Sequence, residues 1–255
     1  MILDEYILTL PSSQNKLDIF KGEWSSILPE KYNLQTGGTA KLFEDDRILW
    51  AKKVLGHPYF SSVLELGPLE GGHSYMLNSK TNKVISIEAN TRAYLKCLII
   101  KEIFKLKVDF RLGDFNNYLK TCSDKFNVVY ACGVLYHQLK PIELIKLIAA
   151  VTDKLFIWTH YFDAEIIKKR EDISYKFSAL KSMDFEGEKY YYSEYSYKTA
   201  LEWNGFCGGP SETSIWLTKE SLIKALNKYG FTKMQFNFVD ENHPNGAALA
   251  ICARK

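Results

Sequence analysis

The chain has 255 residues and a formal net charge of +3, with 46% hydrophobic and 25% charged residues. These values are typical of a globular protein and exclude general disorder. The length accommodates one large α/β domain, or one domain with a small cap. The small net charge and the absence of long runs of Lys and Arg argue against a nucleic-acid partner.

Five cysteines are scattered along the chain, and none stands in a C-x-x-C pair. Their number and spacing favour reduced thiols over a zinc site or a disulfide framework, which indicates a cytoplasmic protein. The first five residues lack the basic region of a signal peptide. No apolar run approaches the roughly 20 residues that span a bilayer. We therefore expect a soluble protein without a membrane partner.

In chain order, residues 1–60 show no strong strand pattern and are expected to form a helical lead-in. Within them, residues 43–54 have the apolar and charged spacing of an amphipathic helix, which is expected to end at residues 56–58. The lead-in is expected to pack on the domain, and a role as a cover over a ligand site is left open.

From residue 63 onward, apolar strands alternate with helices. The strands are predicted at residues 63–66, 83–88, 108–112, 126–131 and 155–159, and the helices at residues 91–105 and 141–151, with a shorter one starting at residue 74. Thr91 is expected to cap the N-terminus of its helix, and Pro141 to start the next one. This alternation indicates a parallel sheet that is buried on both faces.

Residues 161–217 interrupt the alternation with many tyrosines and, near their end, three glycines. An insertion of this length is usually a functional lid or a disordered segment, and its aromatic content argues against disorder. After it, a helix is predicted from Thr218 to Gly230. Residues 231–239 and 247–253 then predict an antiparallel hairpin, because no helix lies between the two strands.

The first four predicted strands each end in a feature that could contact a ligand. A glycine turn follows the first strand, an acid ends the second, an acid follows the third and a cysteine follows the fourth. The turn at Gly67 lets the backbone approach a ligand, and it leads into a helix whose free N–H groups bind anions. Glu88 ends the second strand about 20 residues beyond Gly67, a spacing that suits an acid bound to ribose hydroxyls. Asp114 and Phe115 follow the third strand, and Cys132 follows the fourth. Because ligands of open α/β sheets lie outside the carboxyl ends of the strands, these residues are expected to border one site.

Each of these residues has a simpler explanation when taken alone. Glu88 is explained equally well as a surface acid at a strand end, and Asp114 as the N-cap of a helix. The dinucleotide fingerprint G-x-G-x-x-G would need a glycine where this chain has Leu69. Four such strand ends in the right order nevertheless favour a nucleotide-like ligand over coincidence.

The turn has the form E-x-G-x-x-x-G and resembles motif I of the class I S-adenosylmethionine-dependent methyltransferases. Residues 63–160 are similar to the core of that family, and the final helix and hairpin are similar to its last two strands. The resemblance implies a Rossmann-like α/β fold with a mostly parallel seven-stranded sheet, one antiparallel strand and S-adenosyl-L-methionine as cofactor. The cofactor domain would span residues 61–255, with a lid insertion at residues 161–217.

Carried over by position, the resemblance assigns three residues to the methionine half of the cofactor. Glu65 and Gly67 would line the methionine chain, and the backbone of Cys132 would lie near its amino group. For the other half, Glu88 would bind the ribose diol and Ala89 would flank adenine. The amino group and ring of adenine would be held by the pair of residues that follows the third strand, Asp114 and Phe115.

The implied reaction is in-line displacement of the sulfonium methyl by an O, N or C atom of the acceptor, with positioning as the main contribution of the enzyme. A base is needed only where the acceptor must lose a proton. His137 follows the fourth strand and His160 the fifth, so both are candidate catalytic bases, unless they serve only as structural hydrogen-bonding groups. The metal-dependent catechol-type branch has an acid in the place of Cys132, so no metal site is expected.

The sequence thus predicts O- or N-methyl transfer to a small-molecule acceptor. Residues 133–137 are also similar to those of enzymes that act on the wobble uridine of transfer RNA, but the basic character of those enzymes is missing here. Two further functions suit such a fold, namely a nicotinamide-dependent oxidoreductase and a non-catalytic nucleotide-binding protein. Leu69 counts against the first, and the retained acids count against the second. A homodimer is left open.

Overall fold

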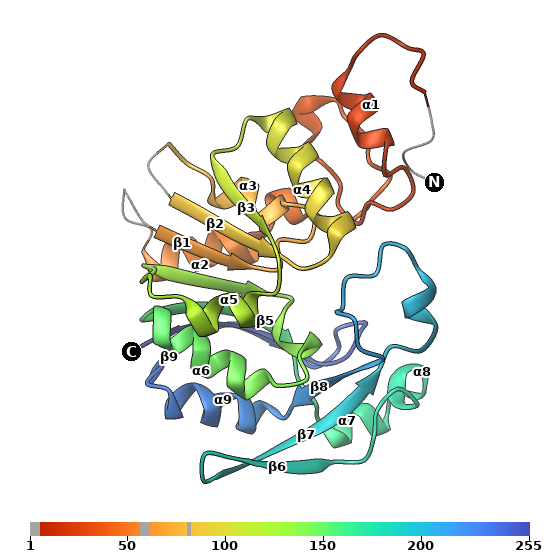
Figure 1. Cartoon of the computed structure of the whole chain (residues 1–255). Coiled ribbons are helices and arrows are strands. Elements are labelled where there is room, and N and C mark those ends of the chain that lie inside the picture. Colours follow the sequence, from red (N-terminus) through yellow and green to blue (C-terminus); the bar gives the residue numbers. More distant parts are fainter. Residues whose placement is uncertain (1–5, 57–61, 81–82) are drawn as a thin grey trace.

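A seven-stranded sheet forms the centre of the chain, for which the computed structural model describes residues 6–56, 62–80 and 83–255 (Figure 1). The strand order is β3-β2-β1-β4-β5-β10-β9. The strands are β1 (Ser62–Leu66), β2 (Lys83–Glu88), β3 (Val108–Leu112), β4 (Val128–Cys132), β5 (Lys154–His160), β9 (Lys233–Asp240) and β10 (Ala248–Arg254). The first five are parallel, and β10 lies antiparallel between β5 and β9. The predicted class I methyltransferase sheet is therefore confirmed.

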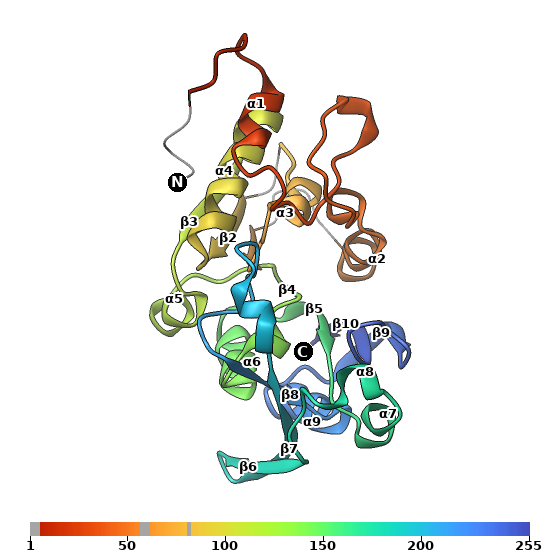
Figure 2. The same cartoon turned by 90° about the vertical axis from the view of Figure 1, so that its right-hand side faces the viewer.

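Helices cover both faces of this sheet (Figures 1 and 2). They are α1 (Ser13–Asp18), α2 (Asp46–Leu55), α3 (Gly72–Leu77) and α4 (Thr91–Phe104) on one face, and α5 (Phe115–Thr121), α6 (Pro141–Val151) and α9 (Lys219–Lys228) on the other. Short 3-10 helices are η1 (Glu30–Tyr32), η2 (Leu42–Glu44), η3 (Leu135–His137) and η4 (Lys198–Glu202). Among the residues described, no helix combines the length and apolar character that crossing a bilayer requires.

The ends of the helices follow local capping chemistry, with one departure from the sequence prediction. Pro141 starts α6, and Gly230, with a φ of +90°, follows the end of α9, both as predicted. The predicted cap of α4, Thr91, is instead the first helical residue, and Asn90 is the cap. Asn90 has extended backbone, and its side-chain oxygen accepts a hydrogen bond from the Ala93 N–H, so it satisfies one of the free donors of the first turn.

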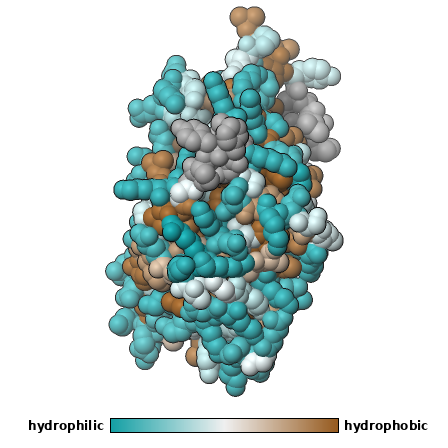
Figure 3. All heavy atoms as spheres, turned by 90° about the vertical axis from the view of Figure 1, so that its left-hand side faces the viewer, coloured by the Kyte–Doolittle hydropathy of each residue, from teal (hydrophilic) through white to brown (hydrophobic). Residues whose placement is uncertain are grey.

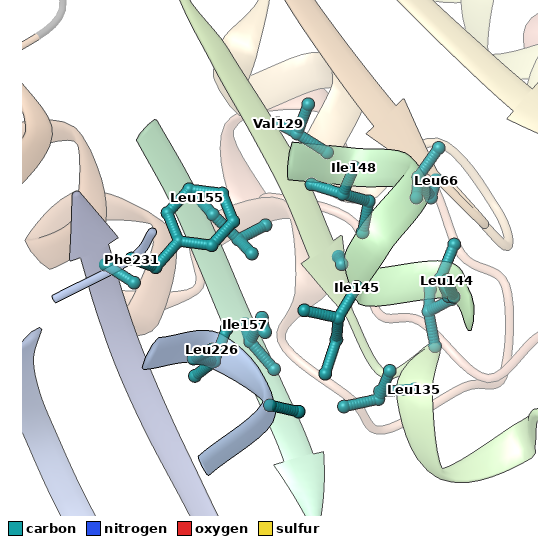
Figure 4. Close-up of a cluster of buried hydrophobic side chains, with 14 of the residues drawn as sticks. Leu66, Val129, Leu135, Leu144, Ile145, Ile148, Leu155, Ile157, Leu226 and Phe231 are labelled. Carbon is teal, nitrogen blue, oxygen red and sulfur yellow. The ribbon is translucent and has the colours of Figure 1, made fainter. Parts of the chain in front are cut away.

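The central strands are largely buried, because both faces of the sheet are packed. On one face, Ile145 and Ile148 of α6 meet Val129 and Leu155 of the sheet (Figure 4). The other face is covered by a second apolar cluster that includes residues of the four N-terminal helices. Hydrophilic side chains predominate on the outer face shown in Figure 3, with hydrophobic ones between them.

The lead-in is fixed to the glycine turn by a buried acid, Glu70. Its carboxylate accepts hydrogen bonds from the Ser25 and Ser26 N–H groups, both at 2.8 Å, and lies 3.1 Å from Lys96 Nζ. A Cβ added at Gly72 would lie only 2.8 Å from the backbone of Leu42. Lead-in and turn therefore pack without space for a side chain between them. The helix predicted at residues 43–54 is the short η2 followed by α2, which ends at Leu55 with Gly56 as its C-cap, as predicted. Residues 1–5 and 57–58 lie outside the part of the chain that is described.

The insertion forms a small second sheet in the order β6-β7-β8. Its elements are α7 (Ala164–Lys168), α8 (Glu171–Ser174), β6 (Lys181–Phe185), β7 (Glu188–Ser196) and β8 (Thr213–Leu217). The sheet is antiparallel, and its buried aromatic residues include Tyr190 and Trp216. The loop between β7 and β8, which contains η4, returns beyond the carboxyl ends of the parallel strands (Figures 1 and 2).

We expect Glu70→Ala to lower the free energy of unfolding by about 3–5 kcal/mol, because it leaves the Lys96 ammonium buried without its partner. Urea denaturation measures this change. Glu102→Ala is the control, because Glu102 pairs with Lys16 and Lys105 at the surface, where solvent screens the ion pairs, so its loss should change the stability much less. Equal losses in the two variants would contradict the assignment of Glu70 as the anchor of the lead-in.

Candidate functional site

A cavity of about 870 Å³ opens at the carboxyl ends of β1, β2 and β4. Its walls come from the lead-in, the glycine turn, the ends of the strands, α5, the segment from η3 to the start of α6, and the loop between β7 and β8. The residues proposed from the sequence that line it are Gly67, Glu88, Ala89, Asp114, Phe115, Cys132 and His137. Glu65 and His160 are not among its lining residues.

The glycine turn has backbone geometry that favours glycine at the cavity. Gly67 has a φ of +63° and Gly71 a φ of +77°. A Cβ at Gly67 would lie 3.1 Å from the Val134 side chain, on the far side of the turn. Leu69 also has a positive φ of +55°, so this turn bends in a left-handed conformation without the second glycine of the dinucleotide fingerprint.

Glu65 lies beneath the turn rather than in the cavity. Its Oε2 accepts hydrogen bonds from the hydroxyls of Ser74 and Ser86, the second at 2.7 Å. Its Oε1 has no hydrogen-bond partner among the described residues, and burial raises the pKa of this carboxyl. The residue thus joins β1, α3 and β2 beneath the cavity.

Glu88 lies at the cavity wall with its carboxylate held by the backbone. Its Oε2 accepts from the Leu69 N–H at 3.1 Å, and its Oε1 accepts from the Asn90 N–H at 2.9 Å. Burial nevertheless raises the pKa of Glu88 to about 7. The acid therefore changes charge near neutral pH, in the position where a ribose would lie.

Asp114 is both the cap of a helix and a lining residue of the cavity. Its Oδ1 accepts a hydrogen bond from the Asn117 N–H at 2.8 Å, so the explanation of this residue as an N-cap is correct. The helix that it caps, α5, is absent from the sequence prediction. Phe115, the first residue of α5, lines the cavity beside it.

A cluster that the sequence analysis missed lies where the lead-in meets the glycine turn and β4. Asp45 Oδ2 lies 2.9 Å from His73 Nε2, and the Arg47 guanidinium donates to both oxygens of the same carboxylate. His73 and Arg47 line the cavity together with Cys132. Arg47 also stacks over the ring of Trp158 at 4.5 Å. The residues are far apart in the sequence, and no local pattern marks them.

The hydrogen bonds and charges within this cluster favour the ionised forms of Asp45 and His73. Although burial acts in the opposite direction, hydrogen bonds from His73 and Arg47 hold the pKa of Asp45 well below its usual range. Burial alone would lower the pKa of His73, but Cys132 and Asp45 beside it raise that pKa to about 10. His73 is therefore an imidazolium at neutral pH, although the sequence assigns it no role.

The two candidate bases have different surroundings. His137 lines the cavity, and its Nδ1 lies 2.6 Å from the hydroxyl of Tyr197, which comes from the insertion. His160 is stacked on Trp216 with ring centroids 4.7 Å apart, and its Nδ1 donates to the Gly246 carbonyl at 2.9 Å. Burial lowers the pKa of His137 to about 3 and that of His160 to about 4, so both rings are neutral near pH 7.

The loop between β7 and β8 covers part of the cavity. Trp203 and Phe206 line it, and the Asn90 side chain donates to the Phe206 carbonyl at 3.3 Å. Gly208 and Gly209 of this loop also line the cavity. The small sheet and the helices α7 and α8 do not line the cavity among the described residues, so the loop between β7 and β8 is the part of the insertion that reaches it.

Comparison with known proteins gives no matching family model. A tRNA U34 carboxymethyltransferase from Campylobacter lari is 26% identical over 110 residues, which are 40% of this chain and 36% of that protein. The chain thus matches about a third of the length of that relative.

Solved structures match over most of the chain. The N-terminal domain of EvdMO1 with SAH bound has a TM-score of 0.72 at 19% identity, and the match covers 94% of both chains. The same domain in the presence of SAH and D-fucose has a TM-score of 0.71 at 18% identity, with the same coverage of 94% of both chains. Burkholderia thailandensis 1,6-didemethyltoxoflavin-N1-methyltransferase, with its substrate and S-adenosylhomocysteine bound, has a TM-score of 0.52 at 14% identity, covering 84% of this chain and 78% of that one. Magnesium protoporphyrin IX methyltransferase from Synechocystis has a TM-score of 0.54 at 14% identity, covering 83% and 81%.

The chain therefore has the fold of the class I S-adenosylmethionine-dependent methyltransferases, with the strand order and the antiparallel strand that the sequence predicted. The resemblance seen in the glycine turn is confirmed at the level of the fold.

The histidines provide a direct test of the site. We expect NMR of the imidazole rings to show His137 and His160 neutral from about pH 5.5 to 8.5, because burial holds their pKa values near 3 and 4. His73 should stay protonated over the same range, because its pKa is about 10. His73→Gln, His137→Gln and His160→Gln assign the signals. A titration midpoint near pH 6.5 for any of the three rings would contradict the electrostatics described above.

Proposed function

We propose that this chain is an enzyme that transfers a methyl group from S-adenosyl-L-methionine to an O or N atom of a small-molecule acceptor. The observation that carries the proposal is the cavity at the carboxyl ends of the strands, bordered by the glycine turn, Glu88 and Asp114. Fold neighbours hold SAH, the demethylated cofactor. The free cysteines favour a cytoplasmic location.

In this proposal, the cofactor lies along the strand ends. The ribose diol donates to Glu88, Ala89 flanks the adenine, and Asp114 with Phe115 holds the adenine amino group and ring. The methionine chain passes Gly67, where the positive φ brings the backbone close to the ligand, and reaches the backbone of Cys132. Glu65 would support the methionine part of the cofactor indirectly, because its carboxylate lies beneath the glycine turn.

The acceptor lies at the end of the cavity beyond Cys132. Tyr136 and Trp158 give this end aromatic walls, while Arg47 and His137 give it polar groups. Aromatic walls with a few polar groups are typical of small-molecule pockets, and the cavity volume falls in the usual range of roughly 300–1,000 Å³. The presence of D-fucose with a fold neighbour favours a sugar hydroxyl as the first acceptor to test.

His137 is the better placed of the two candidate bases. It lines the cavity, and its neutral ring has a nitrogen that can accept a hydrogen bond from the acceptor. Because burial lowers its pKa to about 3, acceptor binding would have to raise that pKa for the ring to act as a base. The Tyr197 hydroxyl fixes the ring orientation from the insertion. His160 lies behind Tyr136 and Trp158, in edge contact with both rings, and supports this wall.

A second candidate acceptor is transfer RNA. The match to the tRNA U34 carboxymethyltransferase and residues 133–137 favour it. RNA binding depends on basic side chains that neutralise phosphates, and a net charge of +3 leaves little excess of basic over acidic residues. We therefore place the small-molecule acceptor first, and a homodimer stays a prediction.

Calorimetry tests the cofactor assignment. The purified chain should bind S-adenosylmethionine and its demethylated product with Kd values of about 1–100 μM, and it should not bind NAD. Glu88→Ala should weaken binding by about 1.5–3 kcal/mol, because it removes hydrogen bonds to a charged group. Gly67→Val should weaken binding at least as much. Binding of NAD with no response to either sulfur cofactor would overturn the proposal.

The affinity for S-adenosylhomocysteine should depend on pH through Glu88. The ionised carboxylate is the better acceptor for the ribose hydroxyls, and its pKa is about 7. Since the ionised fraction rises from about one tenth near pH 6 to about nine tenths near pH 8, Kd should fall roughly tenfold over this interval. Glu88→Gln should remove the dependence, whereas the three histidines of the site do not titrate there. A wild-type affinity that is flat with pH would contradict the assignment of Glu88.

A further inference from the structure

Three side chains that commonly bind metal ions lie close together, namely Asp45, His73 and Cys132. They come from the lead-in, α3 and the end of β4, and they offer one oxygen, one nitrogen and one sulfur atom within 4.8 Å of one another. Asp45 is 7% exposed and His73 is 9% exposed, while Cys132 is partly exposed. This convergence involves three elements and is not the property of any one of them.

The spacing of these atoms suits a tetrahedral ion. Asp45 Oδ2 and His73 Nε2 are 2.9 Å apart, while two ligand atoms of a tetrahedral zinc lie roughly 3.3 Å apart. The three ligand atoms lie within 4.8 Å of one another, so side-chain adjustment would let them enclose an ion in place of the proton between Asp45 and His73. The Arg47 guanidinium already holds the Asp45 carboxylate in place, and metal-ligating carboxylates are commonly oriented by such hydrogen bonds.

The three residues leave one side open. His73 and Cys132 line the main cavity, so a fourth position of a tetrahedral ion would face its interior. Structural zinc sites are closed by four protein ligands, whereas catalytic sites have three ligands and an open position. The geometry is therefore that of a catalytic site.

We propose that Asp45, His73 and Cys132 bind a thiophilic divalent cation of the zinc type, with its open position toward the acceptor end of the cavity. Thiolate and imidazole ligands select zinc or cobalt over magnesium and calcium, which prefer oxygen ligands. Metal ligation requires a neutral imidazole and a thiolate, so binding of the ion releases protons to solvent.

The consequence for the reaction rests on the proposed function, whereas the metal site itself does not. An ion in this position acts as a Lewis acid on a hydroxyl bound at its open position and lowers the pKa of that hydroxyl. The site therefore favours an acceptor that binds through an oxygen atom, such as a sugar hydroxyl. The hydroxyl proton can then pass to His137 or to solvent before the methyl group is transferred.

Cobalt provides the test, because its thiolate complexes absorb in the near ultraviolet. The reduced full-length chain, freed of metal with a chelator, is titrated with CoCl₂. One equivalent should produce a sulfur-to-cobalt charge-transfer band, and zinc should remove the band by displacing cobalt. Cys132→Ser should abolish the band, and His73→Gln should weaken cobalt binding at least tenfold.

Cys207→Ser is the matched control, because Cys207 lines the same cavity but lies outside the cluster. This variant should keep the band and the affinity. Circular dichroism checks that each variant is folded, and S-adenosylhomocysteine binding is measured on the same samples. No band in the wild-type chain, or a band that survives Cys132→Ser and is lost in Cys207→Ser, would overturn the metal site. If the wild-type chain shows the cobalt band but does not bind S-adenosylhomocysteine, the proposed function is overturned and the metal site is not.

Discussion

The buried contact of Glu70 with Lys96 and the Ser25 and Ser26 amides determines how the cavity is closed. A carboxylate in this position must be paired, because an unpaired buried charge costs several kcal/mol. The pairing holds the lead-in against the glycine turn, so the sheet supplies the floor of the cavity and the lead-in supplies one wall. The lead-in thus covers the glycine turn through this contact.

The histidines at and near the cavity carry different charges, because their surroundings differ. His73 is an imidazolium between an acid and a thiol, whereas His137 and His160 are neutral among aromatic rings. Residues of one type whose surroundings push their pKa values apart are suited to different roles. The charged ring lies with the cluster that we propose as a metal site, and the neutral ring of His137 remains free to accept a proton.

The sequence predicted β2, β3 and α6 with their observed bounds, because apolar runs and Pro141 are strong local signals. It also placed Glu88 and Cys132 at strand ends, which is enough to bring them to one edge of a parallel sheet. It missed α5, whose polar residues give little helical periodicity, and the small sheet of the insertion. It also missed the cluster of Asp45 and His73, because that contact depends on how the lead-in folds over the turn. Local patterns identify elements, but they do not show which distant segments meet.

The acceptor is determined outside the shared sheet. Fold neighbours with TM-scores of 0.52 and 0.54 are named for a toxoflavin precursor and a magnesium porphyrin, two acceptors of very different size. A common fold therefore does not fix the acceptor, which depends on the segments added to it. In this chain those segments are the lead-in, with Arg47, and the insertion, with Tyr197 and Trp203. They reach the cavity from opposite sides, and Cys132 lies on the strand between them. In the proposed function, an acceptor between Trp158 and the loop after β7 could contact both segments, so differences in these segments would select the acceptor.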